Sequence, residues 1–70
     1  MNDYFKDNRI SELRNEKKLS QRQLAAKIGT SQANLSRWEK GTILPSIAEC
    51  WRLADFFDVT IDYLAGRSEY

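Results

Sequence analysis

Apolar residues recur along the chain at helical spacing, and short polar or glycine-containing breaks separate them into five segments. The longest segment carries apolar side chains at positions i, i+3, i+4, i+7 and i+10, namely Ile47, Cys50, Trp51, Ala54 and Phe57. Leu53 and Phe56 widen this face, which suits it to packing on other helices. Both tryptophans, Trp38 and Trp51, are expected in the core. The pattern predicts an all-α fold of five short helices around one core.

Start and stop signals place these helices at about residues 7–18, 21–28, 31–40, 46–57 and 61–65. Ser20 and Gln23 form a capping box, in which each side chain satisfies a backbone donor of the other residue. The same arrangement recurs from Ser46 to Glu49 at the fourth helix. Three helices are followed by a glycine, which tolerates the left-handed backbone that commonly ends a helix: Gly29, Gly41 and Gly66.

The two helices within residues 21–40 are joined by a tight turn at Gly29. The second of them carries only two large apolar residues, Leu35 and Trp38, spaced i, i+3. When these two face inward, a step of roughly 100° per residue leaves an outward face without any acid: Gln32, Ala33, Ser36, Arg37 and Lys40. Amide, hydroxyl and cationic side chains are the groups needed to contact base edges and phosphates.

Residues 21–40 (QRQLAAKIGTSQANLSRWEK) resemble the helix-turn-helix of the Cro/phage-repressor type, the XRE-like family of bacterial and phage transcription regulators. RISELRNEKKLSQRQLA before this unit and W-E-K-G, L-P-S and VTIDYLAG after it fit the same family. The resemblance covers about residues 8–66. It implies a compact repressor-like DNA-binding domain, with the helix-turn-helix at helices 2 and 3. We expect residues 1–70 to form a single domain with its core at about 7–66.

Four outward side chains are candidates for base contacts: Gln32, Ala33, Ser36 and Arg37. Arg37 is the strongest, because a guanidinium donates two parallel hydrogen bonds to guanine, although a phosphate contact is the alternative. Gln32 is able to pair with adenine, and Ala33 to meet a thymine methyl, although family members place a longer polar side chain at the latter position. Five residues are candidates for phosphate contacts: Gln21, Ser31, Asn34, Lys40 and Thr42.

The resemblance also implies two side-chain pairs within the domain. In the family, a glutamine at the position of Gln21 contacts a DNA phosphate and hydrogen-bonds the glutamine that begins the recognition helix, here Gln32. An arginine at the position of Arg14 pairs with a glutamate at the position of Glu39. We therefore expect a Gln21–Gln32 hydrogen bond and a structural Arg14–Glu39 ion pair, which would tie the first helix to the end of the recognition helix.

One domain of this size contacts only a few base pairs, so a homodimer on an inverted repeat is expected, with half-sites about 34–36 Å apart. Family resemblance and the remaining apolar residues place the dimer surface at the end of the fourth helix and on the last helix: Phe56, Val59, Tyr63, Leu64 and Tyr70. The expected function is that of a transcriptional repressor of the phage or mobile-element kind, acting on double-stranded DNA in the cytoplasm.

The charge distribution agrees with this placement of the DNA-binding unit. Net charge is only +1, which is weak for a nucleic-acid binder. However, residues 9–40 hold eight bases against three acids, a net +5, whereas residues 41–70 hold two bases against five acids, a net −3. An ordinary solvated surface is the alternative explanation of this asymmetry.

Composition argues against several other classes. One cysteine and no histidine exclude a disulfide framework and an ordinary zinc site, and we expect Cys50 to be a small buried hydrophobe. We expect no enzyme activity, cofactor, metal or small-molecule effector. The spacing of three aspartates favours helix surface and caps over a metal site: Asp55, Asp58 and Asp62. The chain lacks a signal-peptide pattern and a membrane-spanning run.

Three other interpretations stay open. In the first, the chain is an antitoxin or a restriction-controller protein of the same fold. In the second, it is the N-terminal part of a longer repressor. Alternatively, it is a protein-interaction module that lacks DNA readout, to which the near-neutral net charge and Ala33 lend weight. At the start of the chain, Tyr4 and Phe5 are expected to pack against the first helix.

Overall fold

The computed structural model describes residues 5–69, and in this range the chain forms five α-helices and no strand. They are α1 (Ile10–Glu16), α2 (Gln21–Ile28), α3 (Gln32–Lys40), α4 (Ile47–Phe57) and α5 (Ile61–Ala65). The predicted all-α fold is therefore confirmed. None of the described helices has the length and apolarity that a membrane span requires.

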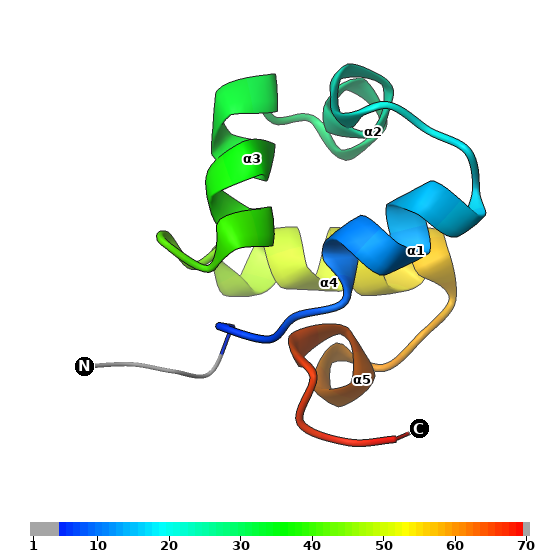
Figure 1. The fold of residues 1–70 in the computed structure, drawn as a ribbon, viewed down its shortest axis with the longest axis vertical. Helices are drawn as coiled ribbons and strands as arrows, with labels where there is room; N and C mark the ends of the chain where they lie inside the picture. Colours follow the sequence, from blue (N-terminus) through cyan, green and yellow to red (C-terminus); the bar gives the residue numbers. More distant parts are fainter. Residues whose placement is uncertain (1–4, 70) are drawn as a thin grey trace.

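The helices pack in several directions around a common centre. Figure 1 views α2 and α5 nearly end on, while α1 and α4 run across the view and α3 stands upright at one edge. Pairwise contacts join α2 to α3, α4 to α5, α2 to α4 and α1 to α3. Each helix contributes one large side chain that is fully buried: Ile10, Leu24, Leu35, Leu53 and Leu64. The core is thus built from all five helices.

The first helix is shorter than the sequence predicted, at both ends. Before it, the Asn8 side chain accepts a hydrogen bond from the Ile10 N–H and donates to the carbonyl oxygens of Phe5 and Trp38. These bonds hold residues 5–9 against the end of α3 instead of in a helix. After it, Lys18 has a left-handed backbone (φ 58°), so helical geometry cannot continue.

The remaining helix bounds follow the local signals in the sequence. Both predicted capping boxes form, between Ser20 and Gln23 and between Ser46 and Glu49. The hydroxyl of Thr60 accepts the Tyr63 N–H at the start of α5. Left-handed caps end α2, α3 and α5 at the three predicted glycines.

Trp51 corrects the sequence analysis, because it is 59% exposed and lies outside the core. The buried face of α4 is instead centred on four other residues: Cys50, Leu53, Ala54 and Phe57. On a helix that turns roughly 100° per residue, Trp51 falls beyond the edge of this face. Ile47, in the uncovered first turn, is 65% exposed. Trp38 and Phe5 are buried as expected, whereas Tyr4 lies outside the described residues.

Candidate nucleic-acid interface

A short turn sets α2 and α3 at a fixed angle to each other. Gly29 adopts a left-handed conformation (φ 87°, ψ 36°), which L-residues with a side chain rarely adopt. The N–H groups of Gly29 and Thr30 both donate to the carbonyl oxygen of Ala25, at 2.9 and 3.0 Å. Ser31 then caps α3, because its hydroxyl accepts the Asn34 N–H at 3.1 Å. Every residue of the turn therefore has a defined role in directing the chain into α3.

The two faces of α3 differ sharply in burial. Leu35 and Trp38 face the core, at 0% and 2% exposure. Five polar or small residues of α3 are exposed: Gln32, Ala33, Asn34, Arg37 and Lys40. Ser36 is half-buried, so of the four predicted base contacts it is the least accessible. In Figure 1, α3 lies at the edge of the molecule, where its outer face is open to a partner.

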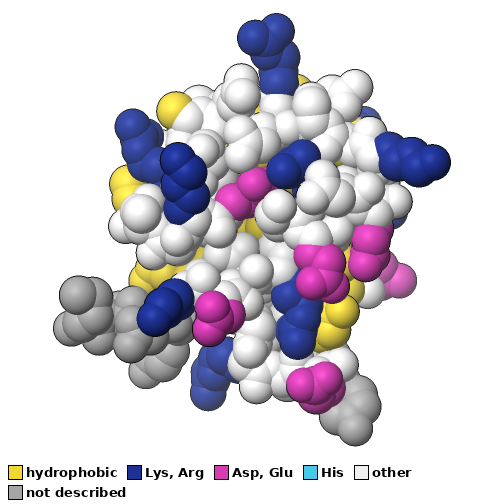
Figure 2. Space-filling model, viewed as in Figure 1, with side chains coloured by type: hydrophobic (Ala, Val, Ile, Leu, Met, Phe, Trp, Pro, Cys, Tyr) yellow, Lys and Arg dark blue, Asp and Glu magenta, His cyan; other side chains and the backbone are white. Residues whose placement is uncertain are grey.

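Cations project around the same part of the surface. In Figure 2, Lys and Arg side chains extend from the upper part of the molecule, over α2 and α3. The acidic side chains visible on this face lie mostly in its lower half, where they mix with other cations. Cations thus gather beside the exposed face of α3, where their charge would attract a polyanion.

Arg14 and Glu39 form a bidentate ion pair between α1 and α3. Arg14 Nε donates to Glu39 Oε2 at 2.7 Å, and Arg14 Nη2 donates to Glu39 Oε1 at 3.3 Å. A third donor of the same guanidinium, Nη1, reaches the Leu19 carbonyl oxygen at 2.8 Å. The two side chains are only 14% and 8% exposed, so this pair is largely removed from water.

Gln21 corrects a second expectation, since it bonds Glu39 and not Gln32. Its Nε2 donates to Glu39 Oε1 at 2.9 Å. A carboxylate is a stronger acceptor than a neutral amide, which explains why the Gln21 amide turns inward. Gln32 consequently remains exposed at the start of α3. Glu39 therefore links α1, α2 and α3 at one point. The spacing of residues in the sequence gave no means of predicting that Gln21 takes part in this link.

The predicted phosphate contacts are placed at the two ends of α3 and at the start of α2. Several of these polar groups already take part in local bonds: Thr42 Oγ1 donates to the Arg37 carbonyl, and Asn34 Nδ2 donates to Thr30 Oγ1. Lys40 is exposed at the end of α3. At the start of α2 the capping box occupies the Gln23 N–H, and the N–H groups of the first turn point outward from the helix end.

Comparison with known proteins decides the family. Residues 10–64 match the family model described as a helix-turn-helix. The chain belongs to the XRE-like helix-turn-helix family. This is a family of DNA-binding transcription regulators and not of enzymes, and α2, the turn and α3 are its helix-turn-helix.

Three relatives align with this chain over 61 residues, which is 87% of its length, and about a third of these aligned positions are identical. The HTH-type transcriptional activator BcrR of Enterococcus faecalis and the HTH-type transcriptional regulator AnsR of Bacillus subtilis are each 36% identical. The uncharacterised HTH-type regulator YobD of B. subtilis is 33% identical. The matched region spans only 30%, 53% and 54% of BcrR, AnsR and YobD, respectively. No solved structure gives a significant match.

The surface proposed from sequence for dimer formation lies away from the helix-turn-helix, and one of its residues is not on the surface. Leu64 is 0% exposed, because α5 buries it in the common core. Phe56, Val59 and Tyr63 are half-buried, and Tyr70 lies outside the described residues.

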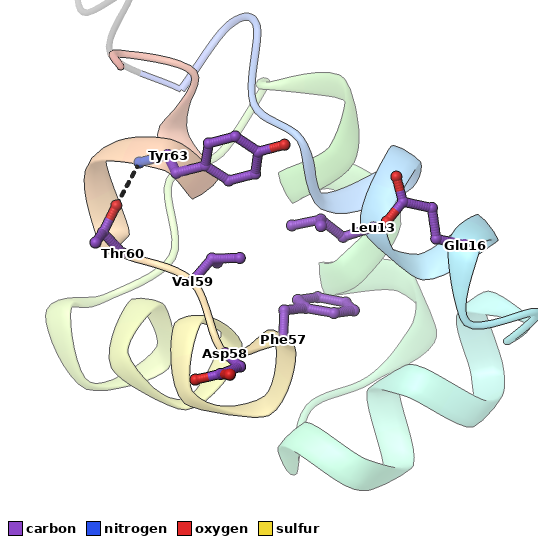
Figure 3. A pocket seen from close by; sticks show the side chains of 7 residues that line it. All are labelled: Leu13, Glu16, Phe57, Asp58, Val59, Thr60 and Tyr63. Carbon is purple, nitrogen blue, oxygen red and sulfur yellow. Dashed lines mark hydrogen bonds between the residues drawn. The ribbon is translucent and has the colours of Figure 1, made fainter. Parts of the chain in front are cut away.

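An open groove of about 630 Å³ crosses this region (Figure 3). Leu13, Phe57 and Val59 point into it from α1, α4 and the turn that follows α4. Cations of the same chain lie over two aromatic rings of this region, those of Tyr63 and Phe56. The Arg9 guanidinium lies 4.1 Å from the centre of the Tyr63 ring, and Lys17 Nζ lies 5.7 Å from that of Phe56.

Within residues 5–69, no cluster of three or more potential metal ligands is found. Cys50 is buried, and its burial, reinforced by the charge of Glu49, raises the pKa of the thiol above its ordinary value. The thiol therefore stays protonated and packs as a small apolar group.

Proposed function

We propose that this chain binds double-stranded DNA sequence-specifically, with α3 in the major groove and α2 across the backbone. The observation that carries the proposal is the exposed face of α3, which holds amide and guanidinium groups and no acid while Leu35 and Trp38 anchor the helix from behind. A helix of this width fits the major groove, where each base pair presents a distinct set of donors and acceptors.

Arg37 and Gln32 are the proposed base contacts. Both side chains are exposed on α3, and each is able to form paired hydrogen bonds, Arg37 with guanine and Gln32 with adenine. Because Gln21 donates to Glu39, its amide does not compete for Gln32 in the free protein. Ala33 is placed to meet a thymine methyl, and half-buried Ser36 makes the smallest contribution.

The proposed phosphate contacts come from both sides of α3. Lys40 is exposed at the end of α3, and the first turn of α2 offers free N–H groups. Ser31, Asn34 and Thr42 are exposed at the ends of α3 and are proposed to contribute weaker hydrogen bonds. Gln21 is proposed to touch phosphate through its backbone N–H, because its side-chain amide is directed towards Glu39.

Specific binding is proposed to require a homodimer on an inverted repeat. Two or three base contacts, at about 1–3 kcal/mol each, discriminate poorly among many competing sites. Two copies on half-sites about 34–36 Å apart double the number of contacts. Such a protein would act in the cytoplasm, on DNA.

Repression is the proposed outcome of binding, because a bound domain blocks a promoter without needing any further contact. The E. faecalis relative carries the name of an activator, so activation is the alternative. A reporter gene downstream of the selected DNA site distinguishes the two by the direction in which expression changes. An antitoxin would instead co-purify with a toxin.

The decisive experiment is selection from random duplex DNA, followed by titration of the enriched sequence. Enrichment of an inverted repeat is expected. Arg37→Ala and Gln32→Ala should each lose preference at one position of the half-site, while Arg67→Ala, outside the helix-turn-helix, should not. Failure to bind duplex DNA even at low salt would contradict the proposal and favour a protein-interaction module.

A further inference from the structure

Residues 5–8, which we call the strap, belong to no helix but are fixed to the end of α3. The Phe5 side chain is buried, at 4% exposure. Asn8 Nδ2 donates to the carbonyl oxygens of Phe5 and Trp38, at 2.7 and 2.8 Å. One amide thus holds the start of the strap to the last turn of α3. Figure 1 shows the described part of the chain starting close to the lower end of this helix.

Two glycines that end helices allow the backbone of the strap to approach closely. A Cβ on Gly41, at the end of α3, would lie 3.0 Å from Lys6 Cα and 3.1 Å from the Phe5 carbonyl oxygen. A Cβ on Gly66, at the end of α5, would collide with the Asp7 carbonyl oxygen. The backbone of Lys6 is therefore held against the end of α3, and that of the acid Asp7 against the end of α5.

Two lysines are exposed at this end of α3, and the nearest acid along the helix is already engaged. Lys6 and Lys40 are both exposed, and within residues 5–69 neither ammonium takes part in an ion pair. The Glu39 side chain is 8% exposed and accepts hydrogen bonds from Arg14 and Gln21. It therefore offers little to neutralise the two lysines, whose charges suit a polyanionic backbone.

We propose that Lys6 binds a DNA phosphate, next to those that Lys40 and Thr42 are proposed to contact. The proposal rests on the DNA-binding function above and adds to it a residue from outside the helix-turn-helix. A lysine ammonium is a point charge on a flexible stem, so a fixed backbone position is enough to bring it to phosphate. Such a contact strengthens binding to every sequence and carries no base preference.

The packing of the strap accounts for Phe5 and Asn8 but not for the lysine between them. Phe5 belongs to the core, and Asn8 bonds two carbonyl oxygens, so both residues stabilise the fold. The Lys6 side chain is exposed to water, and its replacement should leave the melting temperature unchanged. An effect on DNA binding is therefore separable from an effect on folding at this residue.

Titration of the full chain with the selected duplex and with a scrambled duplex, at several salt concentrations, tests the proposal. Lys6→Ala should weaken binding to both duplexes alike, by roughly fivefold at about 0.15 M salt, and reduce the slope of log K against log salt by about 0.9. Lys6→Arg should keep the wild-type slope. The matched control is Lys17→Ala, which removes the same charge beyond the other end of α1, where the ammonium lies over the Phe56 ring. It should leave the slope nearly unchanged.

A double-mutant cycle tests whether the strap positions Lys6. Asn8→Ala removes the two hydrogen bonds that join the strap to α3, and all variants are compared at a temperature where each is folded. In this background Lys6→Ala should weaken DNA binding by less than about twofold. An effect of equal size in both backgrounds would overturn the placement by the strap.

Two further outcomes separate this proposal from the function on which it rests. An unchanged salt slope in Lys6→Ala, with wild-type protein that binds duplex DNA, would overturn the phosphate contact alone. Absence of binding by wild type even at low salt would overturn the contact and the proposed function together.

Discussion

The side-chain amide of Gln21 donates to the carboxylate of Glu39 at 2.9 Å. This hydrogen bond links the first residue of α2 to the last turn of α3. The same carboxylate accepts two hydrogen bonds from Arg14 of α1. One largely buried carboxylate thus links α3 to both α1 and α2. The network holds α3 in position within the free protein.

Arg14→Met should lower the free energy of unfolding by about 3 kcal/mol, because it leaves the Glu39 carboxylate buried without its ion-pair partner. Urea denaturation measures the change. Arg22→Met replaces an exposed arginine on α2 and should change stability by no more than about 0.5 kcal/mol. Equal stability of Arg14→Met and wild type would show that the pair contributes nothing.

Gln21→Glu places a second carboxylate against Glu39, where the wild-type amide donates at 2.9 Å. Repulsion should raise the pKa of the new carboxyl in the folded state, so the folded protein binds a proton more readily than the unfolded chain. Stability, lower by about 1 kcal/mol at pH 7, should therefore recover relative to wild type as pH falls towards 4. Gln23→Glu, at the exposed capping-box position, should lack this recovery; a parallel pH response in both variants would contradict the assignment.

Gly66→Ala should destabilise the protein far more than Gly29→Ala. Both glycines have positive φ, 82° and 87°, so each alanine suffers backbone strain of about 1–2 kcal/mol. At Gly66 the new Cβ would also collide with the carbonyl oxygen of Asp7, whereas at Gly29 the nearest atom is an arginine nitrogen 3.7 Å away. Thermal melts of the two variants should differ clearly, and similar melting temperatures would refute this packing of residue 7 on α5.

Arg37→Ala and Lys40→Ala should weaken DNA binding in different ways. Loss of Arg37 should cost about 1–3 kcal/mol on the selected site and relax preference at one base pair. Loss of Lys40 should weaken binding to all sequences alike and reduce the slope of log K against log salt by about 0.9 for each phosphate that is no longer neutralised. Titrations at several salt concentrations, on selected and scrambled DNA, separate the two; a changed base preference in Lys40→Ala would reverse the assignment.

Cys50 should make stability decline in alkaline solution. Burial raises the thiol pKa above its ordinary 9.0 in the folded state, so the unfolded chain ionises first. Stabilisation from the protonated thiol is complete below that pH and is lost as the pH rises through the folded-state pKa. Cys50→Ala lacks this dependence, so the difference in unfolding free energy between wild type and variant should shrink from pH 8 to pH 10. A constant difference would mean that the thiol titrates normally.

Local features of the structure followed from the sequence, because their causes are local. Capping boxes and glycine caps depend on residues within a few positions of each other, and they set the ends of α2 and the start of α4 as predicted. The buried face of α3 was predictable because this helix has only two large apolar residues, Leu35 and Trp38, and both had to face the core. Exposure of Gln32 and Arg37 follows directly from that choice of face.

Other features depend on which neighbour occupies a given space, which spacing alone does not determine. The apolar periodicity of α4 included Trp51, but α2 and α5 cover a face that stops short of it. Gln21 was expected to bond Gln32, and only the fold shows that a stronger acceptor, Glu39, lies within reach. Leu64 belonged to a helix with too few residues to separate its inner from its outer face, and it proved to be buried.

Every helix contributes one fully buried side chain to the same core, and this has a consequence for how the protein unfolds. Because no pair of helices encloses a core of its own, unfolding should be a two-state event in which α3 is lost together with α1 and α5. Slowly exchanging amides of all five helices should then share a single opening free energy. A substitution as remote from DNA as Ile10→Ala would reduce operator occupancy simply by lowering the fraction of chains that are folded.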